Sequence, residues 1–154
     1  MYYYKDFKEL IDMIQENSLR PILIEGTPGD GKITYLQNNY HTILYDANSF
    51  NDNSFKTNDE KAWYDDVCTQ LRLNPDEKIL VVFDSIDELR NYALPNFFDN
   101  IVFNKNDRYP LPEGVKIVCV TNIGSESELL RNYLEAYKDS FAVVGVPYAT
   151  RRRQ

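Results

Sequence analysis

The chain has 154 residues, of which 43% are hydrophobic and 27% charged, which is the size and balance of one globular domain. Its 17 basic and 24 acidic residues give a net charge of −7, which argues against a protein that binds nucleic acid over its whole surface. It has no apolar run long enough to span a membrane, no signal-peptide pattern, and only two cysteines, Cys68 and Cys119, without metal-site spacing. These features predict a reduced, cytoplasmic protein without membrane contact.

The apolar pattern alternates helices with short buried strands. A first helix is predicted over 4–16, where apolar residues recur every three or four positions. The chain then continues with a strand at 22–24, a helix at 32–40, a strand at 42–45, a helix at 59–71, a strand at 79–83, one or two helices between 86 and 102, a strand at 115–120, a helix at 125–138 and a strand at 141–146. Strands that are apolar on both faces and separated by helices predict an α/β fold with a parallel sheet covered on both sides. Ligands of such sheets bind beyond the carboxyl ends of the strands.

A glycine-rich loop follows the first strand. It matches the G-x-x-x-x-G-K pattern of a phosphate-binding loop and reads Gly26, Thr27, Pro28, Gly29, Asp30, Gly31, Lys32, Ile33 and Thr34. In such a loop, backbone N–H groups converge on phosphate oxygens, and Lys32 would reach the β- and γ-phosphates. Ile33 stands where a serine or threonine normally binds Mg²⁺, and Thr34 lies about 100° further round the helix. The sequence therefore predicts phosphate binding with an altered metal site; the alternative is an ordinary glycine-rich turn.

Acidic residues follow the strand at 79–83. An acidic residue at the end of a buried strand, beside a phosphate loop, is the Walker B arrangement, in which Asp84 would hold Mg²⁺ through water. The alternative is that Asp84 or Ser85 is a helix N-cap, with Asp87 and Glu88 as acids in the first helical turn. With the phosphate loop already in place, the nucleotide role is preferred for Asp84.

Polar residues also follow the strand at 115–120, at Thr121 and Asn122. The Asn122 amide could orient an attacking water between Asp84 and the γ-phosphate. Threonine and asparagine also favour turns, so the pair alone is weak evidence. It indicates a nucleotide site only because it comes third along the chain, after the phosphate loop and the carboxylate.

These three segments resemble the Walker A, Walker B and sensor 1 segments of AAA+ P-loop ATPases. They read GTPGDGK, ILVVFDSIDEL and VKIVCVTN, and the resemblance covers nearly the whole chain. LPEGVKIVCVTN and LEAYKDSFAVVGVP are further similar to the MoxR-like branch. The resemblance implies a three-layer fold with a five-stranded parallel sheet of order 5-1-4-3-2, ATP or ADP with Mg²⁺ as ligand, and a homo- or hetero-oligomer. It also implies that Lys32 is the phosphate lysine, Asp84 the Walker B aspartate and Asn122 the sensor 1 residue.

Three positions depart from an efficient ATPase of this family. Ile33 replaces the magnesium hydroxyl, Ser85 replaces the usual catalytic glutamate, and Ser140 replaces an arginine that acts on the neighbouring subunit. Glu88 could replace the glutamate, because the acidic turn matches the D-x-x-D-E pattern of the related STAND ATPases at Asp84, Asp87 and Glu88. Candidates for the missing arginine are Arg108, Arg131 and Arg151 to Arg153.

The whole chain, 1–154, is expected to form one P-loop domain without the helical lid that usually follows in this family. The leading hypothesis is an ATP-binding module, a weak ATPase that couples nucleotide state to assembly or remodelling of a partner. One alternative is a non-hydrolysing nucleotide-binding scaffold or switch, and another is a motor core similar to superfamily 3 helicases or packaging motors. The acidic charge favours a protein partner over nucleic acid.

Two smaller features concern aromatic residues and the single histidine. Phe50 and Phe55 follow the second strand, where ring-shaped relatives carry loops that grip a substrate, but aromatic anchors in a polar loop are the preferred interpretation. His41 follows a predicted helix and is expected at the surface or a helix end rather than in catalysis.

Overall fold

The computed structural model describes residues 14, 20–26, 31–51, 59–122 and 124–144. These residues contain a five-stranded sheet in which every neighbouring pair of strands is parallel. The strand order is β2-β3-β4-β1-β5, which confirms the expected order 5-1-4-3-2 read from the other edge. The strands are β1 (Ile22–Gly26), β2 (His41–Asp46), β3 (Ile79–Asp84), β4 (Val115–Asn122) and β5 (Ala142–Val144).

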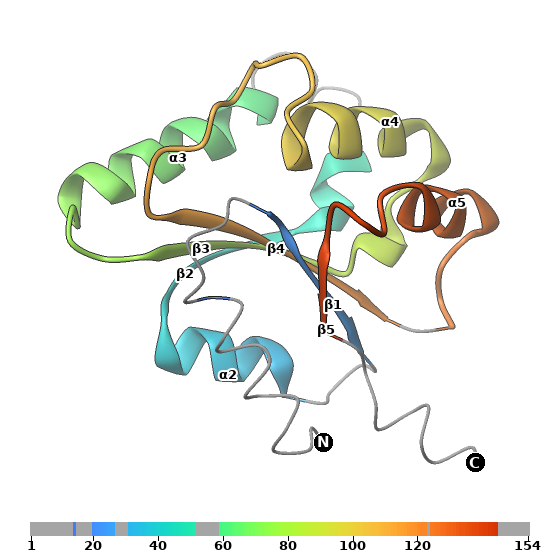
Figure 1. Ribbon diagram of the computed structural model, residues 1–154, viewed down its shortest axis with the longest axis horizontal. Helices are drawn as coiled ribbons and strands as arrows, with labels where there is room; N and C mark the ends of the chain where they lie inside the picture. Colours follow the sequence, from blue (N-terminus) through green and yellow to red (C-terminus); the bar gives the residue numbers. More distant parts are fainter. Residues whose placement is uncertain (1–13, 15–19, 27–30, 52–58, 123, 145–154) are drawn as a thin grey trace.

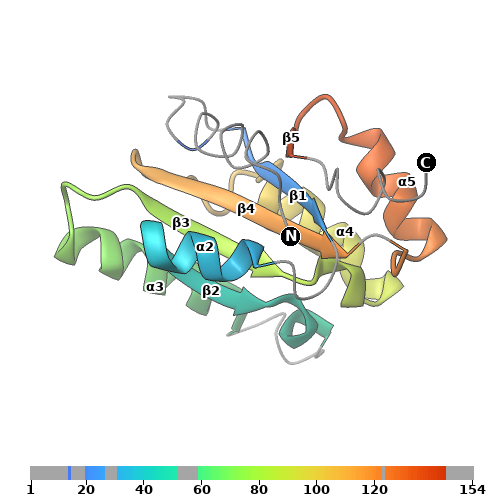
Figure 2. The same ribbon diagram turned by 90° about the horizontal axis from the view of Figure 1, so that it is seen from below.

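Helices cover both faces of this sheet. Figure 1 shows α3, α4 and α5 on one face and α2 on the other, and Figure 2 shows α2 in front of the sheet with α3 behind it. The α-helices are α2 (Lys32–Asn39), α3 (Asp59–Leu73), α4 (Leu94–Asn96) and α5 (Glu128–Ala136). The remaining turns are the 3-10 helices η1 (Ala47–Asn51), η3 (Ile86–Glu88) and η4 (Asn91–Ala93) and the π-helical η5 (Phe97–Val102).

Several boundaries differ from the predicted ones for local reasons. The helix predicted at 125–138 begins at Glu128, because the Ser127 Oγ accepts a hydrogen bond of 3.1 Å from the Leu130 N–H and so caps the helix. The one or two helices predicted between 86 and 102 are four short pieces, η3, η4, α4 and η5. The predicted helix at 4–16 lies outside the described residues except for Ile14, which is helical and fully buried.

The sheet carries a different core on each face. Aliphatic side chains fill the α2 face, where the buried members are Ile14, Ile22, Ile24, Leu36, Leu80, Val82, Val118, Val120 and Ala142. Aromatic rings dominate the other face, and Phe83 on β3 lies at their centre. Its ring centroid is 5.3 Å from that of Phe97 and 5.7 Å from that of Trp63, both in edge-to-face geometry. The aromatic content of the sequence is therefore largely a core feature.

Phe50 belongs to this aromatic core. It is 6% exposed, and its ring meets Phe83 at 5.5 Å and Phe97 at 5.8 Å between centroids. A buried ring cannot grip a substrate, so the preferred interpretation of Phe50 as an anchor is confirmed, whereas Phe55 lies outside the described residues.

Neither cysteine forms a disulfide. Cys119 is fully buried in β4, and that burial raises the pKa of its thiol, so the thiol stays protonated at neutral pH. No helix within the described ranges is long and apolar enough to cross a lipid bilayer.

Candidate functional site

The ends of three central strands bring the predicted segments together. Gly26, the last residue of β1, lies opposite Asn122, the last residue of β4, in the parallel register. On the other side of β4, Phe83 of β3 lies opposite Cys119, and Asp84 follows Phe83 as the last residue of β3. The carboxyl edge of the sheet therefore holds Gly26, the Asp84 carboxylate and the Asn122 amide, and this is the edge where ligands of parallel sheets bind.

The helix that follows the glycine-rich loop has an open N-terminus. Gly31 occupies its N-cap with a φ of 88°, a left-handed conformation that favours glycine, and no side chain caps the helix. Among the described residues, no atom lies within 4 Å of a Cβ placed on Gly31. Unpaired N–H groups at a helix start attract anions. Of the predicted loop, residues 27–30 lie outside the described part of the chain.

The two residues after Lys32 differ in environment. Ile33 is half-buried and packs against the aliphatic core, whereas Thr34 is exposed. The Ile33 side chain therefore serves packing at the position where related loops place a magnesium-binding hydroxyl. This contact is a physical reason for the departure that the sequence showed.

Asp84 is half-buried at the end of β3, and its neighbour Ser85 turns its hydroxyl toward it. The Ser85 Oγ donates to Asp84 Oδ1 at 3.2 Å, while the Ser85 backbone has a φ of 61°. Ser85 occupies the N-cap position of η3, yet no side chain caps that helix. Ser85 therefore takes the N-cap position that the alternative interpretation allowed, with Asp87 and Glu88 in the first turn, but without a side-chain capping hydrogen bond.

Asp87 makes the most specific contact at this edge. Its Oδ1 accepts a hydrogen bond from the Asn122 backbone N–H at 3.0 Å and a second from the Asn122 side-chain Nδ2 at 3.3 Å. The acidic turn after β3 is thereby joined to the end of β4. Sequence reasoning offered Asp87 only as an acid in the first helical turn, and it missed the bond to Asn122, because no pattern along the chain reports a contact across 35 residues.

Asn51 holds the same turn from the opposite side. Its Nδ2 donates to the Glu88 carbonyl oxygen at 2.9 Å, and its Oδ1 accepts from the Arg90 N–H at 2.7 Å. The Tyr92 hydroxyl also donates to the Asn51 carbonyl oxygen. The connection after β2 is thus fastened to the turn that carries Asp87 and Glu88, which the sequence did not reveal.

Glu88 is exposed and stands among other carboxylates. Its pKa is raised, first by partial burial and then by the negative charges of Asp46, Asp87 and Asp84. Asp46 ends β2 directly beside Asp84 in the sheet register. Within the ranges that the structure describes, no three His, Cys, Asp or Glu side chains lie close enough to hold a metal ion by themselves.

Replacing Glu88 with glutamine is expected to stabilise the fold at neutral pH. A carboxyl whose pKa is raised in the folded state supports folding fully below its ordinary pKa, and this support is lost as the pH rises through the raised value. Glu88→Gln removes that loss, so urea unfolding should give similar stabilities near pH 4 and a more stable variant near pH 7. Glu113→Gln, in the exposed loop before β4, is the matched control. A variant less stable than the wild type at neutral pH would contradict the shift.

The candidate arginines lie in different places. Arg131 is exposed on α5 and lines a pocket of about 340 Å³ together with Glu25 and Glu126. Burial and the Glu126 charge raise the pKa of Glu25. Arg108 is exposed in the loop before β4, Ser140 is exposed before β5, and residues 151–153 lie outside the described part of the chain. The structure therefore selects none of these arginines.

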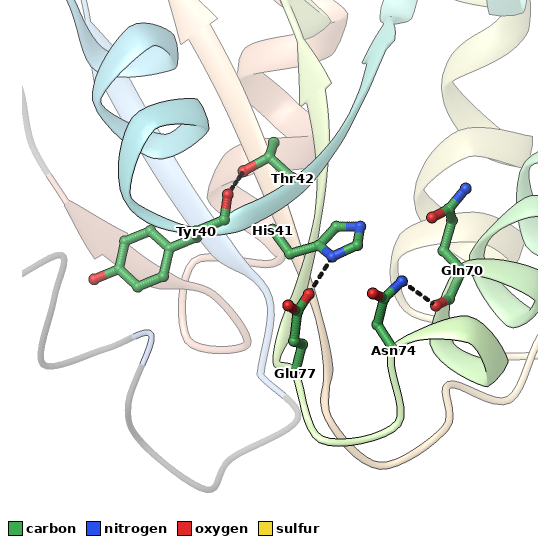
Figure 3. Close-up of polar contacts among 6 residues, drawn as sticks. All are labelled: Tyr40, His41, Thr42, Gln70, Asn74 and Glu77. Atoms are coloured by element: carbon green, nitrogen blue, oxygen red, sulfur yellow. Dashed lines mark hydrogen bonds and ion pairs between the residues drawn. The ribbon is translucent and has the colours of Figure 1, made fainter.

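The opposite edge of the sheet holds His41. Figure 3 shows its imidazole facing Glu77, and Nδ1 and the carboxylate are in hydrogen-bond contact. Lys78, next to Glu77, donates from Nζ to the Ile14 carbonyl oxygen at 2.9 Å. His41 begins β2 while Asp46 ends it, so His41 lies a full strand length away from the candidate site.

No protein-family model and no curated protein matches the chain. Solved structures do match it. Thermotoga maritima RuvB, a Holliday junction branch migration motor, is 15% identical with a TM-score of 0.50, over 92% of this chain and 43% of that one. The replication initiator DnaA bound to AMPPCP and single-stranded DNA is 17% identical with a TM-score of 0.51, and the match covers 93% of this chain and 46% of DnaA. PCH-2 of C. elegans is 17% identical with a TM-score of 0.56, and the match covers 94% of this chain and 42% of PCH-2.

All three structures are AAA+ P-loop ATPases. The chain has the AAA+ core fold. At 15–17% identity this likeness concerns the fold, and the chain spans less than half the length of each of these proteins. In this AAA+ core, β1, β3 and β4 carry the predicted Walker A, Walker B and sensor 1 segments at their carboxyl ends.

Proposed function

We propose that the chain is a nucleotide-binding AAA+ module that binds ATP or ADP with Mg²⁺ and couples nucleotide state to a partner. The observation that carries this proposal is the meeting of three features at one sheet edge. Gly26 and Asn122 are register neighbours, and Asp87 binds Asn122 from the turn that follows Asp84. An open helix N-terminus, a carboxylate and an amide beside it are what a magnesium-bound triphosphate requires.

The residues at this edge fit such a ligand. The segment Gly26 to Thr34 would hold the phosphates, with Lys32 as the cation that contacts the β- and γ-phosphates. The positive φ of Gly31, with no atom of the described residues within 4 Å of its Cβ position, allows a phosphate oxygen to approach the backbone of α2. Asp84 would hold Mg²⁺ through water, since Mg²⁺ typically uses one or two carboxylates together with substrate phosphates.

The protein's own groups would then have separate tasks. Bound Mg²⁺ supplies charge neutralisation at the phosphates. Lys32 would hold the phosphates and Asn122 would orient a water. Glu88 is the proposed group that accepts the proton of that water, and its raised pKa makes it a better proton acceptor than an ordinary glutamate.

The loss of the magnesium hydroxyl at Ile33 favours slow turnover. Because the Ile33 side chain is committed to the aliphatic core, no hydroxyl at this position supports the metal. A nucleotide switch that hydrolyses little is therefore the second candidate. Both candidates require nucleotide binding and differ in turnover.

Asp84→Asn is the variant that tests hydrolysis. Metal-assisted charge stabilisation is worth several kcal/mol, so turnover is expected to fall by about 100-fold or more while ADP binding persists. Asp76→Asn, in the exposed turn before β3, is the matched control and should keep full turnover. Phosphate release is measured across protein concentration, because a site shared between subunits gives a specific activity that rises with concentration.

Each outcome of this assay decides between the candidates. Turnover that depends on Asp84 establishes an ATPase. Nucleotide binding without turnover at any protein concentration establishes the switch. If neither ATP nor ADP binds in the presence of Mg²⁺, the proposed function is wrong.

We further propose that residues 1–154 act as one P-loop unit within a homo- or hetero-oligomer, and that a protein partner is favoured by the net charge of −7. RuvB is a Holliday junction branch migration motor, and DnaA is bound to single-stranded DNA in its structure, so nucleic acid is the alternative to test. Binding to single strands that weakens steeply with added salt would favour that alternative, including the superfamily 3-like motor.

A further inference from the structure

Asp87 contacts one residue of the candidate site at two points. Its Oδ1 accepts from the Asn122 backbone N–H at 3.0 Å and from the Asn122 Nδ2 at 3.3 Å. Two bonds from one residue to one oxygen restrain both the backbone and the side-chain torsions of that residue. Asp87 itself is half-buried in η3, a short turn with little intrinsic rigidity.

Two further contacts make this arrangement firm. Asn51 binds the backbone on both sides of Leu89, at Glu88 and Arg90, so η3 cannot move away from η1 without breaking them. On the other side, the Asn122 carbonyl oxygen accepts from the Ser125 N–H at 3.2 Å. Asp87 therefore joins two segments that are each held independently.

The direction of the Asn122 amide follows from its partner. Because Nδ2 donates to a carboxylate, Oδ1 lies on the other side of the planar amide group. Within the described part of the chain, no N–H or O–H group donates to Asn122 Oδ1. That oxygen is an acceptor, and a water that must be oriented for attack has hydrogens to donate to it.

We propose that Asp87 is a positioning residue that holds the Asn122 amide with its oxygen available to a water molecule at the nucleotide. This inference rests on the proposed function and assigns a role to the second acid of the turn. Asp87 acts through Asn122, whereas Asp84 and Glu88 are proposed to act on metal and water.

The test uses magnetic resonance spectra of the full chain. The Asn122 side-chain amide signals are identified by their absence in Asn122→Ala. Asp87→Ala is expected to shift both the side-chain and backbone amide protons of Asn122 upfield, as the loss of a hydrogen bond does. Asp87→Asn keeps an acceptor oxygen and should leave these signals near their wild-type positions. Asp99→Ala is the control. Asp99 lies on η5 and accepts a hydrogen bond from the Tyr137 hydroxyl, so its replacement is expected to leave the Asn122 signals unchanged.

Addition of a non-hydrolysable ATP analogue with Mg²⁺ gives the decisive arm. The proposal expects the side-chain amide signals of wild-type Asn122 to keep their hydrogen-bonded chemical shifts when the analogue is bound. It is overturned if the analogue moves the side-chain signals to the position seen in Asp87→Ala, or if Asp87→Ala leaves them in place. Should Asp87→Ala fail to fold, Asp87→Glu keeps the charge, displaces the oxygen by one methylene and is expected to shift the same signals.

Turnover supplies a second readout. Misplacing a group by about 1 Å can cost about 100-fold, so Asp87→Ala is expected to lower kcat with little change in the KM for ATP. Asp87→Asn should restore kcat, and Asp87→Ala should add little to Asn122→Ala in the double variant. Additive losses would overturn the proposal. Nucleotide binding by the wild type and by Lys32→Ala is measured separately, so a failure of the proposed function is distinguished from a failure of this inference.

Discussion

Lys32→Ala is expected to weaken ATP binding by about 30-fold or more. The expected loss is about 2 kcal/mol, the usual contribution of a hydrogen bond to a charged group, and each 1.4 kcal/mol is about tenfold in affinity. Lys32 is the first residue of α2 and follows the left-handed Gly31. Calorimetric titration with ATP and with ADP, in the presence of Mg²⁺, measures the effect.

Lys138→Ala is the matched control for this experiment. Lys138 is an exposed lysine whose Nζ lies 2.8 Å from Glu135 Oε1. Its removal alters the net charge as Lys32→Ala does and should leave nucleotide affinity unchanged. Equal dissociation constants for the wild type and Lys32→Ala would remove Lys32 from the site.

Phe83→Ala is expected to lower the free energy of unfolding by about 4 kcal/mol, the range in which truncation of a buried phenylalanine falls. Phe83 is fully buried, and four aromatic rings surround it, with centroids at 5.3 to 5.9 Å. No single neighbour can fill the cavity, because each ring is held by its own contacts. Urea unfolding followed by circular dichroism gives the measurement.

Leu73→Ala is the comparison for Phe83→Ala. Leu73 is 71% exposed at the end of α3, and exposed substitutions usually change stability by less than about 0.5 kcal/mol. Similar losses in the two variants would mean that the aromatic cluster is not the main core. Because Asp84 follows Phe83 directly, Phe83→Ala should also weaken nucleotide binding at temperatures near its own unfolding transition.

Most of the sheet was predictable from local pattern. Runs such as Ile79 to Phe83 are apolar on both faces and too short for helices, and they form strands at the expected places. The strand order came from the family resemblance, because apolar patterns do not say which strands are neighbours. The structure confirms that order.

The segment between β3 and β4 was less predictable. The sequence indicated one or two helices, but Ser85 adopts a left-handed conformation and a short helix with Pro95 in its first turn begins at Leu94. Other residues of this segment contact η1 and α5, as Glu88 does with Asn51 and Phe98 with Tyr133, and sequence periodicity cannot report such contacts. Phe50 is similar, since its polar neighbours hide the fact that its ring completes the aromatic core.

Some residues of the candidate site could be predicted from the sequence and others could not. Gly26, Asp84 and Asn122 could be predicted because each follows a strand, and parallel strands end at one edge. The roles of Asp87 and Asn51 could not be predicted, since both depend on contacts between segments 35 or more residues apart. The packing of Ile33 against the aliphatic core likewise required the position of α2.

The most direct test of a nucleotide site at the carboxyl edge is an ATP titration followed by backbone amide spectra of the full chain. The proposal expects the signals of Gly26 and Gly31 to shift with ATP and Mg²⁺. Those of His41 and Glu77, at the opposite edge, should stay in place. Absence of shifts at saturating ATP, or shifts centred on His41 and Glu77, would contradict it.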